Sequence, residues 1–217
     1  MTGTVTIWTY DWVPNGPRGH VRDLRLRWAM EEAGIPYAIA TVPIADRGPD
    51  HVARQPFAQV PFIEDDGVRL FESGACLLHL AEQSEILMPR DPKMRAETMQ
   101  WIFAALNSVE MVTVPWWYIR MKGVTENPLA GWMRQRFEKL EVVLASRDWL
   151  AANRFTAADL LMADVLRIPA KLGQLEEFPA LTSYLERVCD RPAFRKAVQD
   201  QLDHFEAADI QRKQAGA

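Results

Sequence analysis

The strongest constraint on the fold is that strand-forming segments occur only in the first 71 residues of this 217-residue chain. Val5–Tyr10 (VTIWTY) is rich in β-branched and aromatic residues, which is typical of a strand. Val21–Ala33 places apolar residues on two helical faces, and Gly34 stands where a helix would end. Tyr37–Ile44 is a second strand pattern. A strand, a helix and a strand in this order favour a parallel pair.

Three further elements complete a small α/β domain. Phe62–Asp65 and Val68–Phe71 are strand patterns joined at Asp66-Gly67. Asp-Gly is a strong hairpin signal because both central residues of the favoured turn need positive φ. Ser73–Glu82 is predicted to be a helix with Ser73 as its N-cap. The polar segment before the hairpin has room for one helical turn, so the order β-α-β-α-β-β-α is expected.

The rest of the chain is predicted to be helical. Residues 93–121 form a long apolar-periodic segment in which Pro115 should kink or break the helix. Further helices are expected over residues 128–146, 156–168, 179–189 and 192–202. Gln83–Pro92 is polar and contains two prolines, which is typical of a linker. We therefore expect an α/β domain over residues 1–82, a linker over 83–92 and an all-helical domain over 93–217.

Composition excludes several classes of function. The formal net charge is −4, from 25 basic and 29 acidic residues, so the chain has no bulk positive field for nucleic acid. It contains neither a signal-peptide pattern nor an apolar run of about 18 residues that would span a membrane. Cys76 and Cys189 lie in separate helical patterns, which favours a reducing cytoplasm over a disulfide framework. There is no clustered His/Cys pattern, and no metal site is expected.

Gln59-Val60-Pro61 connects an irregular segment to a strand. A proline at such a place is often cis when the chain must reverse tightly. The backbone N–H and C=O of Val60 would then face outward and could pair with an extended peptide ligand, as a strand edge does. The alternative is a proline that merely starts an edge strand.

Glu72-Ser73 opens the helix that follows the hairpin. The backbone N–H groups and the hydroxyl of a serine at a helix start favour a carboxylate. Glu72 beside it could accept an ammonium group. A carboxylate and an ammonium on one carbon are an amino-acid head group. The alternatives are a plain N-cap worth about 1 kcal/mol for Ser73 and an exposed strand end for Glu72.

Four motifs together resemble the cytosolic glutathione transferases of bacterial type. They are residues 55–61 (QPFAQVP), 72–76 (ESGAC), 25–37 (RLRWAMEEAGIPY) and 155–159 (FTAAD). In the last motif, Thr156 and Asp159 form a capping-box-like pair whose role is structural. The resemblance spans nearly the whole chain.

The resemblance implies an α/β thioredoxin-like N-terminal domain followed by an all-α helical C-terminal domain, usually in a homodimer. It implies glutathione as co-substrate, with the γ-glutamyl group on Glu72 and Ser73. It also implies that the cysteine backbone of glutathione pairs with Val60, before a cis Pro61 and with Gln59 nearby.

The loop expected to activate the thiol departs from the family's pattern. The glutathione thiol must be held as thiolate, and a free thiol has a pKa of about 8.5. The family usually places Tyr, Ser or Cys between the first strand and the first helix, but residues 10–20 (YDWVPNGPRGH) contain no Ser or Cys. Alignment from the strand and alignment from the helix differ by six residues, which indicates an insertion. Tyr10, Asn15 and His20 remain alternative catalytic residues, and Arg18 could supply positive charge to glutathione.

Each of these residues also has a plain structural interpretation. Tyr10 can simply pack under the loop, and the arginines at 18, 22, 25 and 27 can form a solvated face.

The second substrate is expected between the domains. The aromatic residues expected to line its pocket are Trp12, Trp116, Trp117 and Tyr118. Their alternative role is in a core or a dimer interface.

The function expected from the sequence is that of a cytoplasmic, detoxifying glutathione transferase that conjugates glutathione to an alkyl or aryl group. Peroxide or disulfide reduction belongs to the same chemistry. The first alternative is a related binding protein that holds glutathione without efficient thiolate activation. A thioredoxin-like disulfide-active protein is a weaker alternative, because no cysteine precedes the first helix.

Overall fold

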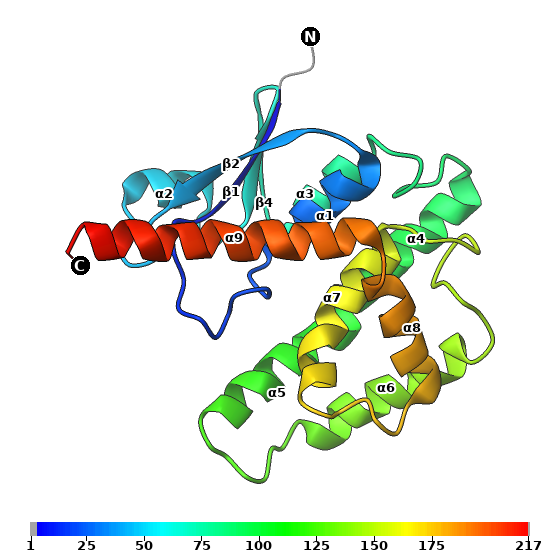
Figure 1. The fold of residues 1–217 in the computed structure, drawn as a ribbon. Coiled ribbons are helices and arrows are strands. Elements are labelled where there is room, and N and C mark those ends of the chain that lie inside the picture. The colour runs from blue at the N-terminus through cyan, green and yellow to red at the C-terminus, as the bar shows by residue number, and fades with distance from the viewer. Residues whose placement is uncertain (1–3, 217) are drawn as a thin grey trace. The chain divides into compact units, whose positions relative to one another are not determined.

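The computed structural model describes residues 4–216, which form two compact units. The first unit joins Met1–Gln83 to Pro192–Ala217, and the second is Ser84–Arg191. Figure 1 shows a small sheet with its helices in the first unit and helices alone in the second. The structure therefore confirms the expected fold class, an α/β unit combined with an all-helical unit.

The sheet of the first unit has four strands in the order β2-β1-β3-β4. The strands are β1 (Val5–Tyr10), β2 (Tyr37–Val42), β3 (Phe62–Asp65) and β4 (Val68–Phe71). β1 pairs with β2 in parallel, and the hairpin of β3 and β4 adds two antiparallel pairings. The helices that follow β1, β2 and β4 are α1 (Asp23–Ala33), α2 (Pro49–Arg54) and α3 (Ser73–Ala81). This is the predicted order of elements.

Local turn chemistry explains two of the chain reversals in this unit. Asp66 and Gly67 have φ of 46° and 82°, the positive values that a tight hairpin requires. Gly34 ends α1 in the left-handed conformation with φ of 65°, where a side chain would be strained.

The C-terminal helix α9 (Pro192–Gln214) belongs to the first unit, contrary to the domain boundary expected from the sequence. Figure 1 shows it running beside α1. Its buried residues, Phe194, Ala197, Gln201 and Phe205, recur every three or four positions and so form one face. The ring of Phe194 lies 4.6 Å from the ring of Trp28 in α1. This apolar face packs against α1. The last helix of the helical domain expected over 93–217 therefore belongs to the first unit.

The second unit contains α4 (Pro92–Ala104), the π-helix η1 (Ala105–Glu110), α5 (Met111–Met121), α6 (Ala130–Leu144), α7 (Ala157–Lys171) and α8 (Pro179–Cys189). Of the kink or break expected at Pro115, the break does not occur, because this residue lies inside α5. A proline removes one backbone hydrogen bond and crowds the carbonyl four residues before it, and the departure from α-helical geometry lies just before that carbonyl, in η1. Most residues of α7 are buried, so α7 forms the centre of this unit.

Thr156 and Asp159 form the expected capping box at the start of α7. The Thr156 hydroxyl accepts from the Ala158 N–H, and the Asp159 carboxylate accepts from the Thr156 N–H at 2.9 Å. In residues 4–216, no helix combines the length and apolar character that a membrane crossing needs.

Candidate functional site

The segment before β3 presents unpaired backbone. The Val60–Pro61 peptide bond is cis, as expected. Gln59 is exposed and Val60 is half-buried. Within residues 4–216, no hydrogen bond engages the N–H or C=O of Val60. Nε2 of His51, in α2, lies 2.9 Å from the Gln59 carbonyl and holds the segment from behind. The Val60 peptide groups can therefore pair with an extended ligand.

The start of α3 differs in detail from the prediction. Glu72 is the N-cap, exposed and with φ of 70°, and Ser73 is the first helical residue. The N-cap residue Glu72 makes no side-chain capping hydrogen bond, and the Oγ of Ser73 accepts from Nη1 of Arg25 at 3.0 Å. Arg25 is 2% exposed, so its charge is fixed behind the start of α3. A helix N-terminus with a buried guanidinium behind it favours an anion.

The idea that the arginines of α1 form a solvated face is wrong for Arg25 and Arg27. Both are buried, and Nε of Arg27 binds Oδ2 of Asp23 at 2.7 Å. Gln201 of α9 donates to the other oxygen of Asp23 at 2.7 Å and to the Val21 carbonyl at 3.0 Å. Burial raises the pKa of Asp23, and the charge of Arg27 opposes that shift. The sequence shows the i,i+4 spacing of Asp23 and Arg27 but gives no signal for Gln201, because the last helix is expected in the other domain.

The loop between β1 and α1 is tied to α9 through Asp209. The Asp209 carboxylate accepts from Nε1 of Trp12 at 2.6 Å and from both terminal nitrogens of Arg18 at 2.7 Å. Arg18 also donates to the Val13 carbonyl, at 3.0 and 3.1 Å. The guanidinium of Arg212 lies 4.6 Å from the Trp12 ring. The hydrogen bonds from Arg18 hold the pKa of Asp209 well below its usual range.

The three alternative catalytic residues occupy different places on this loop. Tyr10 is half-buried and, like Val60, packs against the apolar cluster of Val13, Val21 and Phe205. Burial raises the pKa of the Tyr10 hydroxyl, and the charge of Arg47 opposes this. Asn15 is exposed, and its carbonyl accepts from the Arg18 N–H at 3.3 Å. His20 is partly exposed near the end of the loop. Tyr10 is the one of these three that shares a cluster with Val60.

The aromatic residues of α5 do not form one surface. Consecutive residues on an α-helix point about 100° apart, and Trp116 is buried, Trp117 partly buried and Tyr118 56% exposed. The Trp116 carbonyl accepts from the side chain of Asn127 at 2.7 Å. Trp116 thus has the core position that the sequence left as an alternative. In the described part of the chain, no group of His, Cys, Asp and Glu is arranged to hold a metal ion.

Comparison with known proteins identifies the family. Residues 16–82 match the model of the glutathione S-transferase N-terminal domain, and residues 130–192 match that of its C-terminal domain. The disulfide-bond oxidoreductase YfcG of Escherichia coli is 26% identical over 84% of this chain and 90% of that protein. Glutathione S-transferase 1 of Zea mays is 26% identical over 79% of this chain and 88% of that protein. The fold alone is shared with a glutathione transferase from Pseudomonas putida solved with glutathione disulfide bound, at a TM-score of 0.77 and 19% identity, over 90% of both chains. The chain belongs to the glutathione S-transferase family.

Proposed function

We propose that this protein binds glutathione and transfers its thiolate to a small electrophile. The observation that carries the proposal is the unpaired backbone of Val60 beside a cis proline, in the same compact unit as Glu72 and Ser73. In the proposed complex, the cysteine backbone of glutathione pairs with Val60 and the γ-glutamyl carboxylate lies at the start of α3. Glu72 accepts from the ammonium group, and Gln59 lies beside the peptide.

The proposed reaction is a nucleophilic substitution or addition. The thiol proton passes to solvent, the sulfur forms a bond to carbon, and a leaving group departs with its electron pair. We propose Tyr10 as the donor to the thiolate, because it packs against the same apolar cluster as Val60 and a tyrosine hydroxyl is protonated at neutral pH. Disulfide reduction by glutathione would use the same thiolate, and the similarity to the disulfide-bond oxidoreductase YfcG of Escherichia coli makes a small disulfide a second substrate to test.

A specific observation also supports a binding protein with weak turnover. The guanidinium of Arg18, the charge expected to stabilise a thiolate, is paired with Asp209. Glutathione binding without turnover of a chlorodinitrobenzene or a small disulfide would favour this second function. Turnover that falls at least tenfold in Tyr10→Phe would favour the enzyme.

The glutathione site itself is tested by Glu72→Gln and Ser73→Ala. Glu72→Gln removes the negative charge opposite the ammonium group, and Ser73→Ala removes a hydroxyl donor to the carboxylate, so we expect calorimetry to show about tenfold lower glutathione affinity in each. Glu82→Gln, an exposed carboxylate just past the other end of α3, is the matched control and should bind normally. Unchanged affinity in both test variants would refute the proposed site.

We also propose that the protein acts as a cytoplasmic homodimer, as the family implies. Exposed apolar side chains on α2, on β4 and between α2 and β3 support a protein contact there: Val52, Phe57, Val68 and Phe71. The rings of Phe57 and Phe71 lie 6.4 Å apart. Light scattering of the wild type and of Phe57→Ser would check this, with a monomeric wild type counting against it.

A further inference from the structure

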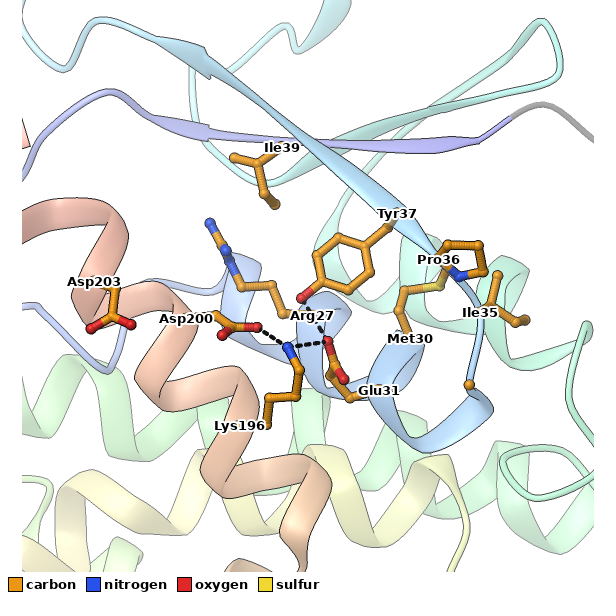
Figure 2. Close-up of a pocket in the computed structure, with 11 residues that line it drawn as sticks. Arg27, Met30, Glu31, Ile35, Pro36, Tyr37, Ile39, Lys196, Asp200 and Asp203 are labelled. Carbon is orange, nitrogen blue, oxygen red and sulfur yellow. Dashed lines mark hydrogen bonds and ion pairs between the residues drawn. The ribbon is translucent and has the colours of Figure 1, made fainter. Parts of the chain in front are cut away.

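A pocket of about 690 Å³ lies on the first unit, lined by α1, β2 and α9. It shares no residue with the proposed glutathione site. One wall is apolar and is made by Met30, Ile35, Pro36 and Ile39 with the ring of Tyr37. Figure 2 shows these side chains on one side of the pocket and the charged side chains of α9 across from them.

Most of the polar groups in the pocket are already paired. Nζ of Lys196 lies 3.0 Å from Oε1 of Glu31 and also binds Asp200. The Tyr37 hydroxyl donates to Glu31 at 3.1 Å. Figure 2 shows these interactions as one connected group.

Arg27 has a nitrogen that is not paired in this way. Its side chain is 3% exposed, and Nε is the nitrogen that binds Asp23. Nη2 is buried and has no hydrogen-bond acceptor within residues 4–216. Figure 2 shows the guanidinium extending toward Ile39, away from the pair of Lys196 and Glu31. A buried donor without an acceptor costs free energy that a ligand oxygen would recover.

The charge of the pocket limits what that ligand can be. Three carboxylates, Glu31, Asp200 and Asp203, face two cations, Arg27 and Lys196. The excess of negative charge disfavours a simple anion such as phosphate, although Arg27 requires an acceptor. A ligand that satisfies both conditions carries one negative and one positive group. The apolar wall further favours a ligand with a hydrophobic side chain.

We propose that this pocket binds a small zwitterion with an apolar side chain, of the class of the aliphatic α-amino acids. Its carboxylate accepts from Arg27, its ammonium group binds Asp203, and its side chain packs on Ile35 and Ile39. Asp203 is exposed, so its free oxygen is available, while its other oxygen accepts from Gln199 at 2.7 Å.

The test is calorimetric titration of the whole protein with L-leucine. Two probes of the same shape remove one charge each: 4-methylpentanoate lacks the ammonium group, and 3-methylbutylamine lacks the carboxylate. We expect leucine to bind and each probe to bind at least tenfold more weakly. No binding of leucine at millimolar concentrations would overturn the proposal, as would equal binding of leucine and 4-methylpentanoate.

Variants locate the site. Asp203→Asn should weaken leucine binding about tenfold, from the loss of one charged hydrogen bond. Glu206→Gln, three residues further along α9 and outside the pocket lining, should leave it unchanged. Arg27→Lys keeps a positive charge near Asp23 but loses the additional N–H donors of the guanidinium. It should abolish leucine binding, provided that circular dichroism shows the variant to be folded. If it does not fold, the Asp203 and Glu206 pair decides, and equal effects of the two would refute the assignment.

Discussion

Asp159 is a buried carboxyl group that organises the start of α7. It accepts from the N–H groups of Leu150 and Thr156 at 2.9 Å and from the Tyr184 hydroxyl at 3.1 Å. Burial nevertheless raises its pKa to about 6, because removing the charge from water outweighs these hydrogen bonds. The residue is structural, since each of its partners is a folding contact of the second unit.

The raised pKa gives a pH-dependent stability. The folded protein holds the Asp159 proton up to about pH 6, while an ordinary aspartate releases it near 3.8. Protonation therefore favours the folded state, and the contribution of Asp159 falls as pH rises from about 4 through 6, by up to about 3 kcal/mol. Urea unfolding of wild type and Asp159→Asn at several pH values checks this, because groups common to both cancel. A pH-independent difference between the two would contradict it.

The two cysteines should be unreactive in the folded protein. Burial raises the pKa of Cys76 to about 12 and that of Cys189 to about 11. Because the thiolate is the reactive form, iodoacetamide at pH 8 should alkylate neither residue while free glutathione in the same tube is consumed. Mass spectrometry reads the outcome, and unfolding in urea should expose both thiols. Rapid native labelling of Cys76 would show that its helix opens.

At the scale of elements, α9 acts as the support of the β1–α1 loop. Residues on one side of this helix hold the loop at several points. Asp209 binds Trp12 and Arg18, Gln201 binds the Val21 carbonyl, and Nε2 of His204 lies 3.0 Å from the Tyr10 carbonyl. The conformation of the proposed catalytic loop therefore depends on the last helix of the chain.

Asp209→Ala should loosen this loop. It leaves Arg18 and Trp12 without their shared carboxylate, so cleavage by trypsin after Arg18 should be at least several-fold faster and Trp12 fluorescence should shift to longer wavelength. The Arg18 contact depresses the pKa of Asp209, so the stability that this contact contributes is fully present above the ordinary aspartate pKa and declines as pH falls from there toward the depressed value. Glu206→Ala, an exposed carboxylate on the same helix, is the control. Equal rates of proteolysis in the two variants would show that Asp209 does not hold the β1–α1 loop.

The elements were predictable where local chemistry decides them. Asp66-Gly67 requires a turn of one type, and Thr156 with Asp159 requires a helix start, whatever lies around them. The partner of α9 was not predictable, because apolar residues spaced by three and four show that a helix has a buried face but not what covers it. The burial of Arg25 and Arg27 was not predictable either, because it depends on how α1 packs against its neighbouring helices. The acceptor of Arg25, Ser73 on α3, is identifiable only once the helices are packed, whereas Asp23 lies four residues before Arg27 on the same helix.

At the scale of the whole molecule, the proposed glutathione residues all lie in a unit built from both ends of the chain. Residues 1–83 supply Val60, Glu72 and Ser73, and residues 192–217 complete the core beneath the loop. The C-terminal segment is thus expected to be needed for the folding of a unit that begins nearly 200 residues earlier.

Phe205 tests this dependence. It is fully buried against Val13 and Val21, and the truncation Phe205→Ala should cost about 3–5 kcal/mol through lost burial and a cavity. Ile210→Ala removes a side chain that is 57% exposed on the same helix and should change stability by less than about 0.5 kcal/mol. Urea unfolding followed by circular dichroism measures both, and glutathione affinity should fall only in Phe205→Ala. If the two variants are equally stable, α9 does not complete the core of the first unit.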